Sequence, residues 1–403
     1  MEWQDYKTPC YVIDLERFRK NCMEIKRPFE EMWESRVEFG YSVKTNHDRN
    51  LMRYAAERLG WDIETVSPAE YEDACAVTVP GRIIFNGPCK GTYLKKAYEA
   101  GSMINLDHLS EVEELCGGAY GKDGGTEIGI RLNFDLEFFC PGETTAGDSV
   151  SRFGICYENG DFAKAVGMLR AAGIEPAGIH LHTSTKSRSA RVFRMLARKA
   201  AEVIREFDLK LSYVDMGGGF FGGQKVAGKP EMKEYAQCIC DELRQAVSPQ
   251  ETRLILEPGA SVLATSVLYL SRVINVREIR GTEVVTLDGT LLHINPFFND
   301  RVPTYRLYRN EETAARARRK KQIVCGSTCM ENDRFLECAE AEALCEGDLF
   351  EFHAAGAYTM AFNSQFILRT PEVYVRNEEG KGRPRYIVEA ETGETDAENH
   401  GDL

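Results

Sequence analysis

The sequence lacks the features that place a protein in a membrane or on nucleic acid. No apolar run is long enough to cross a bilayer, and the first five residues are polar and acidic, unlike a secretion signal. Positive charge is in deficit: 50 Lys and Arg stand against 63 Asp and Glu, a net charge of −13. This balance argues against nucleic acid or an anionic membrane as a partner. We therefore expect a cytoplasmic protein.

Paired cysteine motifs are also missing. The 13 cysteines include no Cys-x-x-Cys. The spacings of Cys238 with Cys240 and of Cys325 with Cys329 are loose for a zinc site, so we expect no metal. An odd number of cysteines in a chain expected in the cytoplasm predicts free thiols, mostly buried.

The middle of the chain alternates strand-like and helix-like stretches. About eight such units in about 230 residues predict an α/β fold, a (β/α)8 TIM barrel. A doubly wound open sheet is the alternative, and the count of eight favours the barrel. The predicted strands are Val37–Lys44, Asp62–Val66, Arg82–Phe85, Ser102–Leu106, Glu127–Asn133, Gly178–His182, Ser212–Met216 and Arg253–Leu256.

After about residue 260 the sequence becomes rich in short β-like runs, which predict a C-terminal β-sandwich or β-barrel domain. Pro9–Asp14 reads as a strand that could join its sheet, and the charge-rich Tyr305–Arg319 could be helical. We predict a barrel over 25–265, a β domain formed by 1–24 with 266–378, and a disordered acidic tail over 379–403. The predicted strands of the β domain are Val262–Val273, Glu283–Leu287, Lys321–Val324, Leu349–Phe352, Phe366–Leu368 and Glu372–Val375.

Lys44 closes the first predicted barrel strand. Alternation puts Val37, Phe39, Tyr41 and Val43 on one face and leaves Lys44 at the tip of a small polar face. A lysine at the end of a buried strand is a candidate for a Schiff base, because burial favours the neutral, nucleophilic amine. Taken alone, a lysine is more often a solvated surface group.

Other predicted strands end in residues with matching chemistry. His180 and His182 share a face of their strand, Gly217-Gly218-Gly219 is a candidate phosphate-binding turn, and Pro258 directs Glu257 outward. Each has a plain structural explanation: a core histidine, a tight turn, a solvated carboxylate. Chemistry in a barrel gathers at the strand ends, however, and a lysine, a phosphate cradle and an acid are what pyridoxal phosphate requires.

These residues resemble those of the fold-type III pyridoxal-phosphate decarboxylases, which include the diaminopimelate, ornithine and arginine decarboxylases. The resemblance runs from about Thr8 to Val375 in the family order. Its motifs are Tyr41-Ser42-Val43-Lys44-Thr45-Asn46, Glu64-Thr65-Val66-Ser67-Pro68-Ala69-Glu70, Asn86-Gly87-Pro88-Cys89-Lys90, Ser151-Arg152-Phe153-Gly154, His182, Gly217–Gly219, Glu257-Pro258-Gly259, Cys329 with Asp333, and Ala355-Gly356-Ala357-Tyr358.

The resemblance implies a role for each of these residues. Lys44 would attach to the cofactor, His182 would stack on its ring and Glu257 would pair with the ring nitrogen. The phosphate and the rest of the cofactor would be held by Thr185, Gly217, Gly218, Gly219, Gly259 and Tyr358. Cys329 would return a proton to the product across the interface of a homodimer, and Arg301, Glu331, Asp333 and Tyr358 would contact the substrate.

The chain departs from the family pattern at positions that read the substrate. Ala260 stands where an arginine usually follows the glycine, and Met330 replaces an acidic residue. We therefore expect decarboxylation of an amino acid, either diaminopimelate-, ornithine- or lysine-like or a conjugate. An amino-acid racemase and a non-catalytic cofactor-binding protein are the alternatives. The Cys-x-x-x-Asp element and the second domain count against them.

Overall fold

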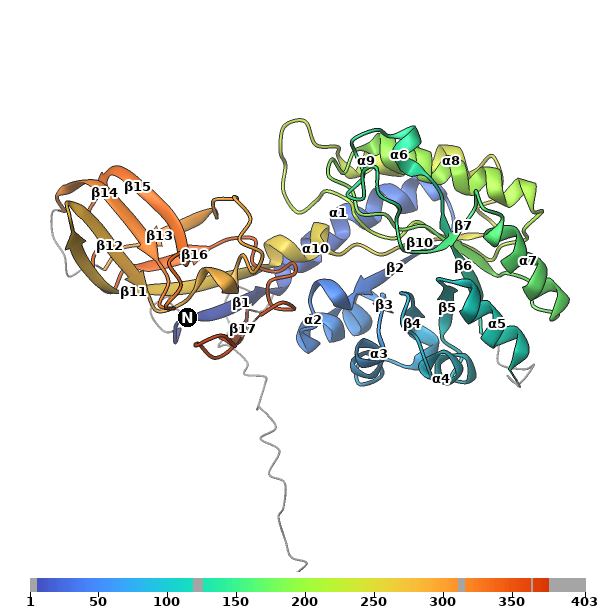
Figure 1. Cartoon of the computed structure of the whole chain (residues 1–403), viewed down its shortest axis with the longest axis horizontal. Coiled ribbons are helices and arrows are strands. Elements are labelled where there is room, and N and C mark those ends of the chain that lie inside the picture. The colour runs from blue at the N-terminus through green and yellow to red at the C-terminus, as the bar shows by residue number, and fades with distance from the viewer. Residues whose placement is uncertain (1–5, 119–125, 311–315, 364, 377–403) are drawn as a thin grey trace, which may run out of the picture.

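Eight parallel strands close into a barrel (Figure 1). The computed structural model describes residues 6–118, 126–310, 316–363 and 365–376 of the chain. Strand β5 pairs with β6 as well as with β4, so the ring has no free edge. The eight predicted strands are confirmed, and closure rules out the open sheet. The barrel strands are β2 Val37–Ser42, β3 Asp62–Thr65, β4 Ile83–Phe85, β5 Met103–Leu106, β6 Ile128–Asn133, β8 Gly178–His180, β9 Tyr213–Asp215 and β10 Arg253–Leu256; the short β7, Ile155–Cys156, pairs with β6.

One large side chain fills the interior of the barrel. The ring of Tyr213 occupies the space that a Cβ atom would need at Gly129 on β6 or Gly178 on β8, so only glycine fits at either position. The Tyr213 hydroxyl donates a hydrogen bond of 2.8 Å to Oδ1 of Asn105. Tyr213 begins β9 and Asp215 ends it, so the Asp215 carboxylate lies towards the carboxyl ends of the strands.

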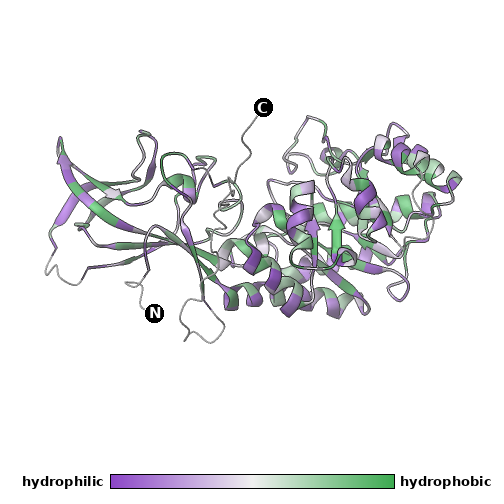
Figure 2. Ribbon diagram, turned by 90° about the horizontal axis from the view of Figure 1, so that it is seen from below, coloured by the Kyte–Doolittle hydropathy of each residue, from purple (hydrophilic) through white to green (hydrophobic). Residues whose placement is uncertain are grey.

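Helices cover the outside of the barrel with their apolar faces inward (Figure 2). In α8 the buried residues recur every three or four positions, and the Ser189 side chain caps the helix by accepting from the N–H of Val192. The helices are α1 Leu15–Trp33, α2 Arg49–Tyr54 with a π-helical turn Ala55–Leu59, α3 Pro68–Cys75, α4 Tyr93–Glu99, α5 Leu109–Gly117, α6 Leu136–Phe139, α7 Asp161–Ala171, α8 Ala190–Glu206, α9 Met232–Leu243 and α10 Ala260–Leu263.

The second domain is a curled mixed sheet (Figure 1). The N-terminal strand β1 pairs antiparallel with β11 and parallel with β17, which confirms that it joins the C-terminal sheet. Strands β12 and β14 also pair in parallel. The strands are β1 Cys10–Asp14, β11 Val267–Ile279, β12 Thr282–Leu287, β13 Tyr305–Tyr308, β14 Arg318–Cys325, β15 Arg334–Glu342, β16 Leu349–Phe352 and β17 Glu372–Arg376.

Several predicted elements of this region were wrong. Tyr305–Tyr308 is the strand β13, whose backbone pairs with β16, so no helix begins there. The predicted strand Val262–Val273 starts as the helix α10 and a 3-10 turn before β11 begins. Phe366–Leu368 is not a strand.

Helix α1 was not predicted, although the spacing of its buried residues from Phe18 to Trp33 is helical. The proposed division between residues 24 and 25 falls inside α1, and the domain limits stay a prediction. The predicted tail, 379–403, lies outside the described residues.

The cysteines are free thiols, as predicted, but most of them are not buried. Five are buried, namely Cys10, Cys22, Cys140, Cys238 and Cys240. Cys329 is among the exposed ones. Across the described residues, no helix combines the length and the apolar character that crossing a bilayer requires.

Candidate active site

Lys44 lies just beyond β2 rather than within it. The strand ends at Ser42, and Val43–Thr45 forms a 3-10 turn. The Lys44 Nζ lies 2.7 and 2.6 Å from Oε1 and Oε2 of Glu64, the buried carboxylate on β3. Burial works to lower the pKa of Lys44, but the charges of Glu64 and then Glu257 outweigh it and raise the pKa. The prediction of a neutral amine is therefore wrong here, because the paired amine keeps its proton.

A glycine and an asparagine bring two carboxylates close to Lys44. A Cβ atom at Gly40 would lie 3.3 Å from Cβ of Glu64 and 3.6 Å from Cγ of Glu257, so both acids approach the bare backbone of β2. The Asn86 side-chain amide donates to Oε1 of Glu257 at 2.5 Å and to Oε1 of Glu64 at 3.3 Å. Asn86 therefore fixes the spacing of the two carboxylates.

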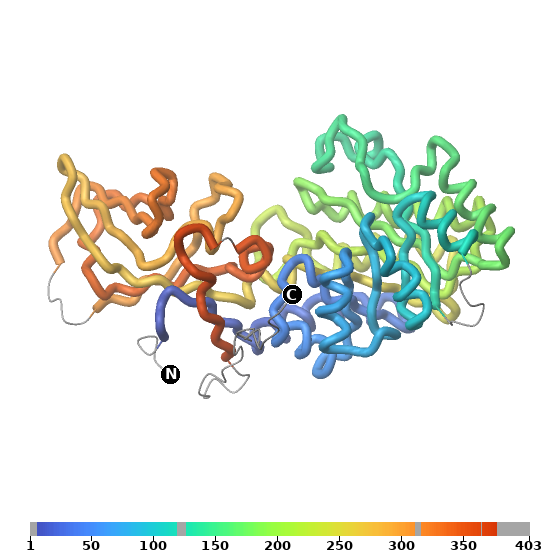
Figure 3. Tube along the Cα trace, turned by 60° about the horizontal axis from the view of Figure 1, so that its bottom comes forward, coloured from blue at the N-terminus to red at the C-terminus, as the bar shows by residue number. Residues whose placement is uncertain are grey.

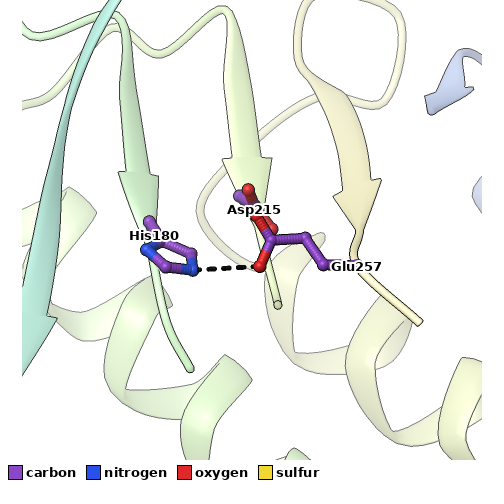
Figure 4. Close-up of side chains that lie close together, drawn as sticks. All are labelled: His180, Asp215 and Glu257. Carbon is purple, nitrogen blue, oxygen red and sulfur yellow. Dashed lines mark ion pairs between the residues drawn. The ribbon is translucent and has the colours of Figure 1, made fainter. Parts of the chain in front are cut away.

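Three buried residues meet at the carboxyl ends of neighbouring strands (Figure 4). His180 ends β8, Asp215 ends β9, and Glu257 follows β10. The Nε2 of His180 lies 3.4 Å from Oε2 of Glu257. Oδ1 of Asp215 accepts the N–H of Gly217 at 2.8 Å, and its Oδ2 has no hydrogen-bond partner among the described residues. The side-chain donor atoms of the three lie within 4.8 Å of one another, a composition that can also bind a metal.

The two carboxylates of this cluster carry different charges. Burial raises the pKa of Asp215 well above its usual range, and the nearby Glu257 raises it further. For Glu257, burial would also raise the pKa, but His180 and then Lys44 outweigh it and lower the pKa. Two neighbouring buried carboxylates do not both ionise, so Asp215 holds a proton and Glu257 is the anion.

The ring of His182 is held by the glycine turn that follows β9. Gly218 N–H donates to Nδ1 of His182 at 3.0 Å, which leaves the proton of the neutral ring on Nε2. Burial, and then the charges of Lys44 and Arg131, lower the pKa of His182 well below its usual value. A side chain at Gly218 would overlap the carbonyl oxygen of Glu257, so this approach requires glycine.

A loop from the β domain completes the site. The segment after β16 lies between the β domain and the barrel (Figure 3). Tyr358 N–H donates to the Thr45 carbonyl at 2.9 Å, and the Asn46 side chain donates to the Gly356 carbonyl at 3.0 Å. Gly259 packs on the same turn, where a side chain would overlap Thr45. The Lys44 turn is therefore fixed by both domains.

These groups surround one cavity of about 570 Å³. The lining contains residues that were predicted to belong to the site, and also Glu64 and Asn86, for which no role in the site was predicted. Arg131 was missed altogether; it donates to the His182 carbonyl at 3.1 Å and pairs with Asp107 at 2.8 Å. The lining includes Lys44, Glu64, Asn86, Arg131, Arg152, His180, His182, Thr183, Ser184, Glu257 and Tyr358.

Other predicted residues do not line this cavity. Thr185 lies in the loop after β8, and its hydroxyl accepts the N–H of Arg188. Cys329 is exposed, and Glu331 is fully exposed and lies 3.5 Å from Arg334. Arg301 lines a neighbouring cavity.

Asp333 is buried, and its carboxylate organises the loop that carries Cys329. It accepts hydrogen bonds from the N–H of Leu291 at 2.8 Å and from the N–H and hydroxyl of Thr328 at 3.2 and 2.6 Å. Its predicted contact with substrate stays a prediction.

The residues present fit pyridoxal phosphate. An amine suited to covalent attachment, a flat neutral imidazole and a buried carboxylate anion border one cavity. The glycine turn adds the N–H of Gly219, which has no hydrogen-bond partner among the described residues.

Similarity to known proteins also indicates a pyridoxal-phosphate site. Residues 15–264, more than half of the chain, match the family of the pyridoxal binding domain of pyridoxal-dependent decarboxylases. The chain is similar to the diaminopimelate decarboxylase of Methanothermobacter thermautotrophicus, with 27% identity over 392 residues that cover 94% of this chain and 88% of that protein. For the Bacillus subtilis enzyme of the same name the identity is 26% over 417 residues, covering 97% and 91%.

Solved structures share the fold. The crystal structure of diaminopimelate decarboxylase from M. jannaschii matches with a TM-score of 0.79 and 22% identity, over 94% of this chain and 89% of that chain. The chain therefore belongs to the pyridoxal-dependent decarboxylase family, as an enzyme that uses pyridoxal phosphate to remove CO2 from an amino acid.

Proposed function

We propose that decarboxylation takes place in the cavity around Lys44, with the cofactor held by Lys44, His182 and Glu257. The observation that carries this proposal is the convergence of these three side chains on one cavity from positions just beyond the ends of β2, β8 and β10. The bound cofactor supplies an electron sink for the pair left behind when CO2 departs.

The residues around the cavity support distinct roles. Attachment through Lys44 requires its Nζ to lose a proton, and Glu64 is the acceptor at 2.6 to 2.7 Å. The Gly218 hydrogen bond fixes the plane of the His182 ring, which would stack on the ring of the bound cofactor. Anionic Glu257 keeps the ring nitrogen protonated. The glycines Gly217–Gly219, with Thr185, Gly259 and Tyr358, would surround the phosphate of the bound cofactor.

The enzyme acts as a homodimer in which Cys329 of one subunit serves the cavity of the other. Cys329 is exposed and does not line the cavity of its own chain, whereas Asp333 holds its loop in a defined shape. Phe297 and Phe362 are exposed apolar side chains whose ring centroids lie 4.7 Å apart, and such an exposed pair supports a surface that a second subunit covers. In such a dimer the Cys329 thiol would protonate the carbon that has lost CO2.

The substrate is an amino acid with a polar or charged distal group. Arg301 supports a distal carboxylate, as in diaminopimelate or a conjugate, and Glu331 supports a distal amine. Met330 and Ala260 distinguish this chain from the family pattern and favour a substrate outside the common diamino acids. The absence of disulfides among the 13 cysteines supports a reducing location such as the cytoplasm.

A CO2-release assay tests the function. The protein with added pyridoxal phosphate is screened against diaminopimelate, lysine, ornithine, arginine and carboxylated conjugates, with Lys44→Ala as the blank. Release from one compound that the blank does not release supports the proposal. Inversion of the α-carbon without CO2 release would identify a racemase and refute it.

A further inference from the structure

A second cavity, of about 330 Å³, adjoins the one around Lys44. Tyr358 lines both, so the two cavities meet at this side chain. Phe221 and Gly222, from the loop after β9, and Ala260, the first residue of α10, also line it. It therefore lies at the carboxyl ends of β9 and β10, beside the glycine turn.

The charged side chains that line this second cavity are positive. Arg188, Arg301 and His353 line it, whereas none of the described residues that line it is Asp or Glu. That bias is notable in a chain with a net charge of −13. Ala260, which lines the cavity together with these cationic residues, has one of the smallest side chains there and leaves the cavity unfilled at its position.

Of the two arginines, Arg188 belongs to the barrel, and hydrogen bonds hold its backbone in place. Its N–H donates to Oγ1 of Thr185 at 3.2 Å, and its carbonyl accepts from the Tyr235 hydroxyl. The side chain is half-buried, and its guanidinium has no ion pair or hydrogen bond with any described residue. A half-buried cation with a pinned backbone and no partner is placed for an anionic ligand.

We propose that Arg188 provides the guanidinium that pairs with the phosphate of pyridoxal phosphate, in the space that the small side chain of Ala260 leaves open. The inference rests on the proposed attachment of the cofactor at Lys44. A dianion beside the glycine turn would gain a bidentate partner from Arg188, while Arg301, exposed on the β domain, stays available to the substrate.

The test compares pyridoxal phosphate with pyridoxal, which differ only in the phosphate. Dissociation constants are measured by absorbance titration of the apo protein. In Arg188→Ala the affinity for pyridoxal phosphate should fall about 10- to 100-fold, whereas the affinity for pyridoxal should change less than about twofold. Inorganic phosphate should compete with pyridoxal phosphate in the wild type and do so more weakly in the variant.

Two further variants sharpen the result. Arg191→Ala removes an exposed arginine three residues along that lies 3.7 Å from Glu143, and should leave both affinities unchanged. Adding Ala260→Arg to Arg188→Ala should recover most of the lost affinity, because the new guanidinium enters the same cavity.

The outcomes separate the inference from the proposed function. Equal losses for both compounds, no loss in Arg188→Ala, or a phosphate-specific loss in Arg301→Ala alone would each overturn the role of Arg188. A wild-type protein that binds neither compound would overturn the proposed function itself. Thermal unfolding of each apo variant shows whether the fold is kept.

Discussion

The ion pair between Lys44 and Glu64 makes a quantitative prediction about the reactive amine. Replacing Glu64 with Gln removes the charge that lies against Nζ and keeps a side chain of nearly the same shape. Burial, which works to lower the pKa of Lys44, is then opposed only by weaker and more distant charges. We expect the amine of Glu64→Gln to titrate below that of the wild type.

The size of the shift follows from the geometry. With Nζ 2.6 to 2.7 Å from the two carboxylate oxygens, the charge centres are about 3 Å apart, and an effective dielectric constant of about 20 gives roughly 5–6 kcal/mol of attraction. The Lys44 side chain is 28% exposed, so water screens part of this. Taking about half leaves about 2–3 kcal/mol, so the loss of this attraction lowers the pKa of Lys44 in the variant.

Reductive methylation of the apo protein between about pH 7 and 11, read at Lys44 by peptide mass spectrometry, measures this pKa. Glu57→Gln, which neutralises an exposed glutamate on the outer helix, is the matched control and should leave the titration unchanged. A midpoint in Glu64→Gln equal to or above that of the wild type would refute the role assigned to Glu64.

The same pair affects stability. Because the folded pKa of Lys44 is raised, its contribution is present below about pH 10.5 and is lost as the pH rises through the folded value. The stability difference between wild type and Glu64→Gln should therefore shrink above that pH.

Four other predictions follow from the site and its surroundings. Asp215→Asn imitates the protonated acid and should keep activity within about tenfold of the wild type. Glu257→Gln removes the anion and should lose more than about 100-fold. Equal losses of activity in steady-state assays would mean that the charges of the two carboxylates are assigned wrongly. Cys329→Ala should slow turnover with an unchanged cofactor absorbance, and mixing it with Lys44→Ala should restore activity in mixed dimers; no recovery would place Cys329 outside the partner's site. Burial lowers the pKa of His293 from 6.5 to about 4, so between these pH values the unfolded chain binds a proton that the folded chain does not. The free energy of unfolding should therefore fall by about 2–3 kcal/mol as the pH drops from 7 to 4.5. Urea unfolding at both pH values checks this, and an equal loss of stability in wild type and His293→Gln would contradict it. Dialysis against EDTA should leave CO2 release unchanged, because Glu257 faces the cofactor; loss of activity that added metal restores would assign His180, Asp215 and Glu257 to an ion.

The barrel was predictable because its strands are short apolar runs separated by amphipathic helices. Such runs keep their identity whatever packs around them, as Gly178–His180 and Arg253–Leu256 illustrate. The β domain was less predictable, because strand formation at Tyr305–Tyr308 depends on pairing with β16. Nothing in the charge-rich sequence of this segment indicates that pairing partner. Helix α1 did carry a signal, in the spacing of Phe18, Cys22 and Ile25, that the strand-based division overlooked.

For the site, residue identities were accessible from sequence and their charges were not. Lys44, His182 and Glu257 follow from motifs at strand ends. The protonated state of Lys44 depends on Glu64, which lies on the next strand, and the proton on Asp215 depends on Glu257. Both are consequences of side chains that meet only when the barrel closes, so no local pattern encodes them.

The hydrogen bonds from Tyr358 to Thr45 and from Asn46 to Gly356 have an evolutionary consequence. The interface between the two domains includes the turn that carries Lys44. The barrel is therefore not an independent catalytic unit that can be exchanged between proteins. Variation in the loop after β16 reaches the reactive lysine through these hydrogen bonds and through Tyr358, which lines the same cavity. New substrate preferences can therefore arise by drift in the β domain while every residue of the barrel mouth stays the same.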